Sequence, residues 1–538
     1  MQMHSFFLVV CFLTGYSLAL ATEANEPVQL NRPVFCHKLS LLACLTDTSR
    51  NPDPSIRLNR ELLIPLYVAR QSRPLWTHEQ GLNTIGHAWL IILRKAGVHG
   101  LDPETYSLSE IENSLHTSPD NLLTLELLLS DAFLRFSENM YSGQASVPQR
   151  PDVNYVRKAI FSPLLGLINI TSLADFEHLL DVFIPENAAY RGLQKELAVF
   201  QQRQQRGEWK MLDAGPSLKQ GVRHYQVINL RNLLRLLGDF SAEMQADPYY
   251  FSQALERAVK SFQHRHHLVV DGVVGFTTRQ EMSVSPARRI EQIRLSLERL
   301  RQLPANLGDH YLWVNLAAST LTLFEENKEA LTMRVVIGRP QRSTPTITSV
   351  LKTIVVNPEW VVPRRLAVED LLPMQQLDPE FLGSKQIRVL SGWAGVQTEV
   401  ATNTIDWSKL SSDYFPYQLR QSAGKTNSLG RFKFLFDNPF EIYLHDTPVK
   451  RLFQLERRAF SSGCIRLEKP TLLAKRLLQQ EASLSSMQIL SFLQSDRTKS
   501  LRLKNTIPIY IVYLTAWVTN NEMHFQRDFY HRDVAALH

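Results

Sequence analysis

The stretch EIYLHDTPVKRLFQLERRAFSSGCIRLEKP, residues 441–470, decides how the C-terminal half of the chain is interpreted. It opens with EIYLH, which is typical of a strand that ends at His445. Ser461-Ser462-Gly463-Cys464 follows, and a helical run, TLLAKRLLQQ, comes after it. Small residues and a glycine before a thiol let the backbone turn sharply and leave room for a substrate carbonyl. The pattern predicts a nucleophilic cysteine with a histidine partner.

Cys464 and His445 would each be interpreted as structural if they stood alone. A lone cysteine is most often a small buried hydrophobe, and a lone strand histidine is most often a core residue. Their order and spacing favour a shared site, in which His445 takes the thiol proton or holds it as imidazolium. A helix beginning just after Cys464 would favour the thiolate. The amide N–H groups near Gly463 and Cys464 are the expected oxyanion donors.

The motif resembles the catalytic domain of the L,D-transpeptidase family (YkuD-type). That family has a His, a gap of similar length, then Ser/Thr-His-Gly-Cys, an apolar residue and Arg or Asn. This chain has fifteen residues between His445 and Ser461, and then Ser-Ser-Gly-Cys-Ile-Arg. The departure is Ser462, which stands where the family usually has a second His. The resemblance implies Cys464 as nucleophile, His445 as proton acceptor and donor, and the Gly463 backbone as part of the oxyanion hole.

Neighbouring residues are candidates for substrate binding. We expect Tyr443 and Ser462 to line the pocket. Arg466 either binds a substrate carboxylate or pairs with a local acid. Asp446 is a candidate to orient His445, although this family often uses a backbone carbonyl for that purpose.

Around the motif, the sequence has strand periodicity from about residue 307. YLWVNLAASTLTLFEENKEALTMRVVIG, LKTIVVNPEWVVP, GRFKFLF and IPIYIVYLTAWVT all indicate strands. Residues 364–420 interrupt them with irregular sequence and helical pieces, which predicts an inserted cap that covers the site. We therefore expect a mainly-β catalytic domain over residues 307–520 and a C-terminal tail at 521–538. Trp360 is either a wall of the cleft or part of the core, and Asn427 and Gly430 indicate a turn that enters the site.

The N-terminal half has helical periodicity and predicts a scaffold domain over residues 22–213. A small three-helix unit is expected at 214–284, and a charged amphipathic helix at 285–306 connects it to the strands. Within the unit, Phe262-Gln263 followed by Asp271-Gly272-Val273-Val274-Gly275 resembles the peptidoglycan-binding domain of many wall enzymes. The run Gln-His-Arg-His-His at 263–267 lacks metal-site spacing and indicates a polar helix end.

The first 21 residues indicate a secretory signal that ends in Ala19-Leu20-Ala21. Its first residues lack Lys and Arg, so an uncleaved membrane anchor is the alternative. Removal of the signal would leave Cys36, Cys44 and Cys464, of which the first two could form a disulfide in an oxidising compartment. These features predict export, and we expect the protein in the periplasm, with a membrane contact only through the signal sequence if it stays uncleaved.

Length and composition favour a multidomain α+β protein. The chain has 538 residues, too many for one core, with 44% hydrophobic and 21% charged residues. The net charge of +7 is mild and its basic residues are scattered, which argues against a nucleic-acid partner. Nothing in the sequence calls for a metal or a cofactor, or indicates an oligomeric state.

The resemblance implies the large multidomain type of Gram-negative L,D-transpeptidase, which acts on peptidoglycan stem peptides and glycan. The implied reaction is acyl transfer through a Cys464 thioester, with release of D-alanine and formation of 3→3 cross-links. The implied inhibitors are carbapenems. An L,D-carboxypeptidase that uses water as acceptor, a noncatalytic wall-binding scaffold and an ordinary cysteine protease are the alternatives. The acyl acceptor can be another stem peptide, a lipoprotein or a free D-amino acid.

Overall fold

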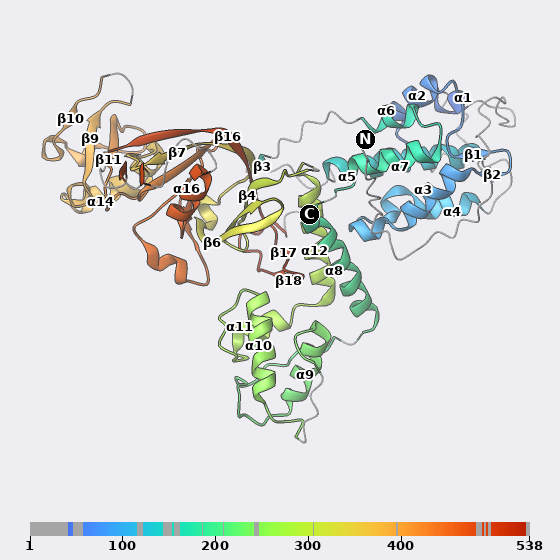
Figure 1. The fold of residues 1–538 in the computed structure, drawn as a ribbon, viewed down its shortest axis with the longest axis horizontal. Coiled ribbons are helices and arrows are strands. Elements are labelled where there is room, and N and C mark those ends of the chain that lie inside the picture. The colour runs from blue at the N-terminus through green and yellow to red at the C-terminus, as the bar shows by residue number, and fades with distance from the viewer. Residues whose placement is uncertain are drawn as a thin grey trace, which may run out of the picture. The chain divides into compact units, whose positions relative to one another are not determined.

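The computed structural model describes residues 41–46, 58–115, 122–143, 153–154, 162–185, 187–207, 209–241, 247–304, 306–393, 396–479, 487–488, 491–492 and 497–533. They fall into two compact units (Figure 1), one drawn from residues 1–89, 110–131 and 164–179, the other from 90–109, 132–163 and 180–538. The predicted signal and Cys36 lie outside the described residues. Within the described ranges, no helix has both the length and the apolarity needed to cross a bilayer.

The first unit is helical, as expected for a scaffold. Its centre is the buried carboxylate of Glu126 on α5 (Leu122–Ser142). Burial raises the pKa of this carboxyl. Four donors satisfy its oxygens, which offsets the cost of burial; they are Leu75 N, Trp76 N, the Thr77 hydroxyl and the Tyr67 hydroxyl on α2 (Arg60–Ala69). The other α-helices between residues 41 and 185 are α1 (Leu41–Thr46), α3 (Thr84–Arg94), α4 (Leu108–Leu115), α6 (Pro163–Ile168) and α7 (Leu173–Phe183).

In the second unit, the predicted connecting helix is α12 (Pro286–Arg301), capped by the Ser285 hydroxyl, which accepts from Arg288 N. It packs against α8 (Ala188–Gln205). Its charge pattern suggests a solvated connector, yet Arg301 is 1% exposed and pairs with Glu298. The helix is therefore an internal element of this unit, with its charges neutralised inside.

The predicted three-helix unit consists of α9 (Gln226–Leu237), α10 (Gln253–Arg265) and α11 (Phe276–Met282) around a shared apolar core. Gln263 organises its turn, because the side-chain oxygen accepts from Gly272 N at 2.8 Å and the amide donates to Asp271 at 2.8 Å. Gly272 has φ +74°, and a Cβ there would lie 2.6 Å from Glu256 Cγ. The Gln and Gly of the sequence motif thus build one loop.

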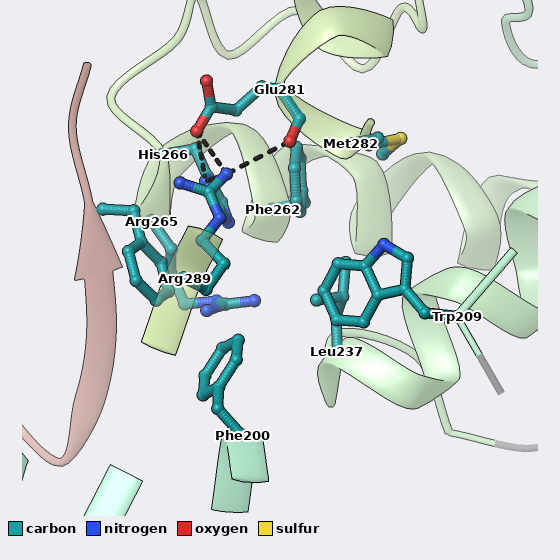
Figure 2. Close-up of a pocket in the computed structure, with 10 residues that line it drawn as sticks. Phe200, Trp209, Leu237, Phe262, Arg265, His266, Glu281, Met282 and Arg289 are labelled. Atoms are coloured by element: carbon teal, nitrogen blue, oxygen red, sulfur yellow. Dashed lines mark hydrogen bonds and ion pairs between the residues drawn. The ribbon is translucent and has the colours of Figure 1, made fainter. Parts of the chain in front are cut away.

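Histidines of the 263–267 run pack within the protein. His266 stacks on Phe262 with ring centroids 3.9 Å apart, and its Nδ1 lies 3.1 Å from the Glu281 carboxylate. Glu281 also pairs with Arg289 of α12 at 2.5 Å. Figure 2 shows these side chains converging at one end of a small pocket. The cluster ties the three-helix unit to α12.

The region predicted to be catalytic is one large mixed sheet with strand order β12-β13-β15-β6-β5-β4-β16-β7-β3. A further pairing between β12 and β7 closes most of it into a ring, and β14 pairs with β6. The strands are β3 (Val153–Asn154), β4 (His310–Asn315), β5 (Thr320–Glu325), β6 (Lys328–Gly338), β7 (Thr346–Val356), β12 (Phe432–Phe436), β13 (Leu444–His445), β14 (Ala459–Ser461), β15 (Ile465–Leu467) and β16 (Lys499–Val512).

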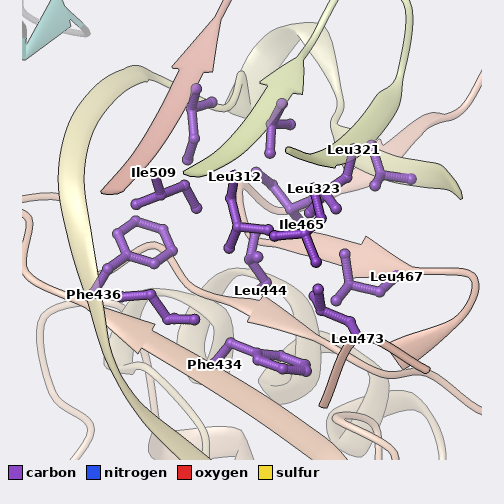
Figure 3. Packing of buried hydrophobic residues seen from close by; sticks show 14 of the residues in the cluster. Leu312, Leu321, Leu323, Phe434, Phe436, Leu444, Ile465, Leu467, Leu473 and Ile509 are labelled. Atoms are coloured by element: carbon purple, nitrogen blue, oxygen red, sulfur yellow. The ribbon is translucent and has the colours of Figure 1, made fainter. Parts of the chain in front are cut away.

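The inside of this sheet is the main apolar core (Figure 3). Phe434, Leu444 and Ile465, on the neighbouring strands β12, β13 and β15, all contribute to it. Side chains alternate along a strand. The residues next to these three in sequence therefore lie on the other face of the sheet.

The predicted cap is a separate small body with its own core. It contains a sheet of order β10-β9-β11-β8, which the helical pieces seen in the sequence did not predict. Its strands are β8 (Trp360–Val361), β9 (Ile387–Ser391), β10 (Glu399–Val400) and β11 (Tyr417–Gln421), and its helices are α13 (Arg364–Leu366), η6 (Ala367–Leu371), α14 (Leu372–Leu377) and α15 (Phe381–Ser384).

The C-terminal residues differ from the expected tail. β18 (Glu522–Phe525) pairs with β17 (Ala516–Thr519), and Tyr530 and Asp533 are buried. Asp533 accepts from the Thr515 hydroxyl at 2.6 Å and pairs with Arg299 of α12 at 2.6 Å. Residues 521–533 therefore belong to the folded unit, because their polar groups are satisfied by distant parts of the chain.

Candidate active site

Three neighbouring strands carry a row of titratable side chains across the outer face of the sheet. Lys433 of β12 is paired in register with His445 of β13, and His445 with Arg466 of β15. Register partners point to the same side of a sheet. Lys433, His445 and Arg466 thus share one face of the sheet, opposite the core of Figure 3. Tyr443 stands two residues before His445, and Cys464 stands two residues before Arg466. Cys464, directly before β15, also packs against that core.

The nucleophile loop, residues 461–464, connects β14 to β15. The Ser461 hydroxyl donates to the Cys464 carbonyl at 2.5 Å and accepts from Gly463 N at 3.2 Å. Gly463 has φ +124°, a conformation that side chains disfavour, and a Cβ there would lie 3.2 Å from Ile442 Cδ1. The predicted glycine is therefore needed for the turn, and its amide donates to the Ser461 hydroxyl.

Cys464 is partly exposed, and its thiol lies 3.9 Å from the carbonyl oxygen of Glu441. Burial raises the pKa of the thiol, while hydrogen bonds from the backbone and hydroxyl of Tyr443 and the charges of Lys433 and Arg466 act in the opposite direction. The resting sulfur is therefore a neutral thiol.

The expected helix directly after Cys464 is wrong. Strand β15 follows the cysteine, and the helix α16 (Pro470–Gln479) begins six residues later. The apolar residues Ile465 and Leu467 belong to the sheet core, which places this segment in a strand. A helix N-terminus at the sulfur, and the thiolate it would favour, are absent from the described site.

His445 is 5% exposed, and its Nδ1 lies 2.6 Å from the Asp446 carbonyl oxygen. A carbonyl only accepts, so Nδ1 carries the proton and Nε2 is the basic nitrogen. Burial, and then the charge of Arg466, lower the pKa of His445 to about 3. His445 is thus a neutral imidazole, and its lowered pKa makes it a weak base.

The contacts of Asp446 show whether its carboxylate or its backbone carbonyl orients His445. The backbone carbonyl of Asp446 holds the ring. Its carboxylate accepts instead from Arg431 N, Thr447 N and Lys450 Nζ, at 2.8, 2.7 and 2.5 Å. Asp446 therefore orients His445 through its main chain.

Tyr443 stands beside both reactive residues. Its ring lies 5.6 Å from that of His445, and its hydroxyl is hydrogen-bonded to the Cys464 thiol and to Trp360. Burial and the adjacent sulfur raise the pKa of this hydroxyl well above its ordinary value. Trp360, on β8 of the cap sheet, therefore contacts a site residue.

Ser462 meets Arg342. Arg342 donates to the Ser462 hydroxyl at 3.1 Å and pairs with Asp370 and Glu369 of the cap at 2.5 Å each. The serine that replaces the usual histidine therefore joins the nucleophile loop to the cap through one arginine.

The predicted turn before the site is present. Gly430 has φ +60°, and a Cβ there would lie 2.4 Å from the Asp446 carboxyl. Asn427 bonds the backbone on both sides of it, donating to Ser422 O at 2.8 Å and accepting from Leu429 N at 2.8 Å. Both residues shape the backbone that carries Lys433.

Sequence reasoning missed Lys433, Arg342 and Thr344. The Thr344 hydroxyl donates to Gly463 O at 2.7 Å and accepts from Gly338 N at 2.9 Å. A local signal existed for Lys433 alone, because it interrupts the phenylalanines of GRFKFLF. That signal indicates only a residue pointing away from the core.

Comparison with known proteins assigns three parts of the chain to families. Residues 309–489 match the "L,D-transpeptidase catalytic domain", residues 61–197 the "Scaffold domain" and residues 215–282 the "Putative peptidoglycan binding domain". A protein of Haemophilus influenzae named "Putative L,D-transpeptidase" is 35% identical over 243 residues, which cover 45% of this chain and 48% of that protein. The chain thus spans about half the length of this curated relative.

Solved structures of similar proteins include an L,D-transpeptidase from Mycobacterium smegmatis, 14% identical, with coverage of 38% of this chain and 58% of that one and a TM-score of 0.18. Another, from Stackebrandtia nassauensis, is 13% identical, with coverage of 56% and 96% and a TM-score of 0.20.

Proposed function

The chain carries an L,D-transpeptidase catalytic domain together with a scaffold domain and a peptidoglycan-binding domain, and on this premise we propose that it forms 3→3 cross-links between peptidoglycan stem peptides. The observation that carries the proposal is the Cys464 thiol, on the loop directly before β15, the strand that pairs with β13 and its neutral His445. A nucleophile and a base with a fixed tautomer are what acyl transfer from a peptide requires.

The first half-reaction forms a thioester. Cys464 Sγ attacks the carbonyl carbon of the third stem residue as Nε2 of His445 accepts the thiol proton. The resulting oxyanion is stabilised by the amide of Cys464 and by that of Gly463, which exchanges its hydrogen bond with the Ser461 hydroxyl for the oxyanion. The C–N bond to the terminal D-alanine then breaks, and His445 returns the proton to the departing amine. Because His445 is neutral before reaction, no prior loss of a proton from the imidazole is needed.

The second half-reaction forms the cross-link. A side-chain amine of another stem attacks the thioester carbon, the C–S bond breaks, and the proton lost by the amine passes through His445 to the sulfur. Water in place of the amine would give a carboxypeptidase. Trp360 and Arg342 link the cap to Tyr443 and Ser462, which supports a cap that excludes water from the intermediate.

The same proposal places the protein in the periplasm, with glycan or stem peptide bound by the three-helix unit. The family matches of residues 215–282 and 309–489 support a wall polymer as the substrate. No described residue is needed for a metal or a cofactor in this mechanism.

The decisive experiment compares wild type with Cys464→Ala on purified tetrapeptide muropeptides, read by mass spectrometry. We expect 3→3 dimers and free D-alanine from wild type and neither from the variant, with unchanged thermal melting of both. Dimers formed equally by both proteins would contradict the proposal. Tripeptides without dimers would favour the carboxypeptidase.

A second measurement addresses a noncatalytic scaffold. Wild type treated with a carbapenem should gain the mass of one drug molecule on Cys464, because the thiol opens the β-lactam ring. The Cys464→Ala protein is the matched control. An unmodified wild type that also makes no dimers would favour the scaffold.

A further inference from the structure

Two cations flank the candidate base without an acidic partner. Lys433 and Arg466 lie on either side of His445 in the strand register. Across the described residues, neither side chain forms an ion pair, and Arg466 Nε is buried without a hydrogen-bond partner. The Lys433 ammonium instead lies over the Tyr443 ring, 4.0 Å from its centroid. Glu441 acts on Lys433 electrostatically but does not pair with it.

Several other basic residues of the catalytic region are neutralised by carboxylates, whereas the partly buried Arg458 donates to the backbone carbonyls of Ala318 and Ser319. The carboxylate pairs include Arg334 with Glu468, Arg342 with Asp370, Lys352 with Asp437, Lys450 with Asp446 and Arg476 with Glu325. Leaving a half-buried charge without a partner is unfavourable. Unlike Arg458, Lys433 and Arg466 have neither a carboxylate nor a backbone carbonyl to balance them among the described residues, so an external anion would complete the charge balance there.

Both charges act at the nucleophile. The charges of Arg466 and Lys433 each lower the pKa of the Cys464 thiol and the pKa of His445. The resting thiol remains neutral, because burial outweighs these charges. The sulfur therefore does not neutralise the two cations before substrate arrives.

We propose that Lys433, together with Arg466, forms a carboxylate-binding subsite that selects the acyl donor. This inference rests on the proposed function and names Lys433 as a specificity-determining residue for it. A tetrapeptide stem offers two carboxylates near the scissile amide: that of the terminal D-alanine and the free carboxylate on the side chain of the third residue. Either would meet a lysine and an arginine next to the attacking sulfur, and the experiment distinguishes them.

The experiment measures the rate of acyl-enzyme formation on Cys464 by intact-protein mass spectrometry. Three tetrapeptide donors are used: the natural one, one with a carboxamide on the terminal D-alanine, and one with a carboxamide on the third residue. The variants are Lys433→Gln and Lys433→Arg. Lys328→Gln, an exposed lysine at the start of β6, is the matched control.

Wild type should react about ten- to hundredfold faster with the natural donor than with the donor that lacks the recognised carboxylate, the usual effect of one charge-assisted hydrogen bond. Lys433→Gln should bring that ratio close to one by slowing the natural donor alone. Lys433→Arg should keep most of the preference, and Lys328→Gln should behave as wild type. The donor whose amidation matters identifies the carboxylate.

Alkylation of Cys464 by iodoacetamide, which is neutral, separates substrate binding from thiol activation. If Lys433→Gln slows alkylation and all donors equally, Lys433 acts on the sulfur and the subsite is contradicted. A wild-type ratio retained by Lys433→Gln, or a wild type indifferent to both amidations, overturns it as well. A wild type that is alkylated but acylated by no tetrapeptide would instead contradict the transpeptidase proposal, and the subsite with it.

Discussion

The protonation states of Cys464 and His445 depend on two features outside the local motif. The sheet buries both groups, and the strand register sets Lys433 and Arg466 beside His445. Burial raises the pKa of the thiol, and burial with the Arg466 charge lowers that of the imidazole to about 3. The resting pair is therefore neutral, unlike the thiolate–imidazolium pair of many cysteine enzymes.

A neutral pair predicts a specific pH profile for Cys464 alkylation by iodoacetamide. His445 is already deprotonated above pH 4, so no inflection is expected near pH 6.5. The rate should continue to rise through pH 9, since the thiol pKa lies above its ordinary value. His445→Gln, which cannot titrate, is the control. A plateau reached below pH 7 in wild type alone would indicate an ion pair.

At the scale of elements, the nucleophile loop is supported by a segment far away in sequence. Thr344 bridges Gly338 N and Gly463 O, and the Tyr530 hydroxyl donates to Gly338 O. Arg532 donates to Thr344 O at 2.9 Å. Residues near the C-terminus therefore hold the turn on which the thiol sits.

Thr344→Val tests this support. Valine keeps the volume but leaves Gly338 N and Gly463 O without their partner, which costs about 1–3 kcal/mol. We expect kcat to fall by about tenfold or more, with a smaller change in KM, because the loop loses its position rather than its substrate contacts. Thr348→Val is the control, as the Thr348 hydroxyl has no hydrogen-bond partner among the residues that the structure describes. Equal effects of both variants would contradict a positioning role.

Arg342 is the link between the cap and the nucleophile loop. Arg342→Met would leave Asp370, Glu369 and Ser462 without their shared donor. We expect faster amide hydrogen exchange in residues 364–384 and a larger fraction of tripeptide product, because a loosened cap admits water. Arg388→Met, which breaks only half-exposed ion pairs within the cap sheet, should leave both unchanged. Unaltered exchange in the Arg342 variant would show that the contact does not hold the cap.

At the scale of the whole molecule, ion pairs between buried side chains hold together helices that are separate in the sequence. Glu281 of α11 pairs with Arg289 of α12 and lies beside His266 of α10 (Figure 2). The pKa of Glu281 lies below its usual range because of Arg289 and His266, despite burial. The carboxylate is therefore ionised in the fold and balances a buried guanidinium.

Glu281→Gln should lower the free energy of unfolding by about 3–5 kcal/mol, since it leaves the Arg289 charge buried without its counter-ion. Thermal denaturation at pH 7 measures the loss. Glu256→Gln, which removes an i,i+4 pair with Lys260, should cost no more than about 0.5 kcal/mol. A melting temperature of Glu281→Gln equal to that of wild type would mean that the cluster adds no stability.

Acid should weaken the same cluster. The folded pKa of His266 is lowered to about 3, so the unfolded chain binds its proton first as the pH falls below the ordinary histidine value. The stability contributed by neutral His266 is therefore present above about pH 6.5 and is lost between that pH and about 3. The drop in melting temperature from pH 7 to 4 should be smaller in His266→Phe. An equal drop in both would contradict this linkage.

The amino-acid sequence by itself determined the order of the parts and the candidate pair of the site. Helical and strand periodicity, the Gln263–Gly272 loop and the spacing from His445 to Cys464 are local in the chain, so they are legible without the fold. The family matches confirm the resemblance to L,D-transpeptidases that this spacing predicts.

Tertiary structure alone decided what surrounds that pair. Strand register placed Lys433 and Arg466 on either side of His445, and burial set the charge of both reactive groups. Residues 521–533, which we expected to form a tail, pack instead against the segment that supports the nucleophile loop. The cap acquired a sheet, and β15 replaced the helix expected after Cys464. Each outcome depends on a partner many residues away. Charge, pairing and desolvation are properties of neighbours in space, and a linear pattern specifies only neighbours in sequence.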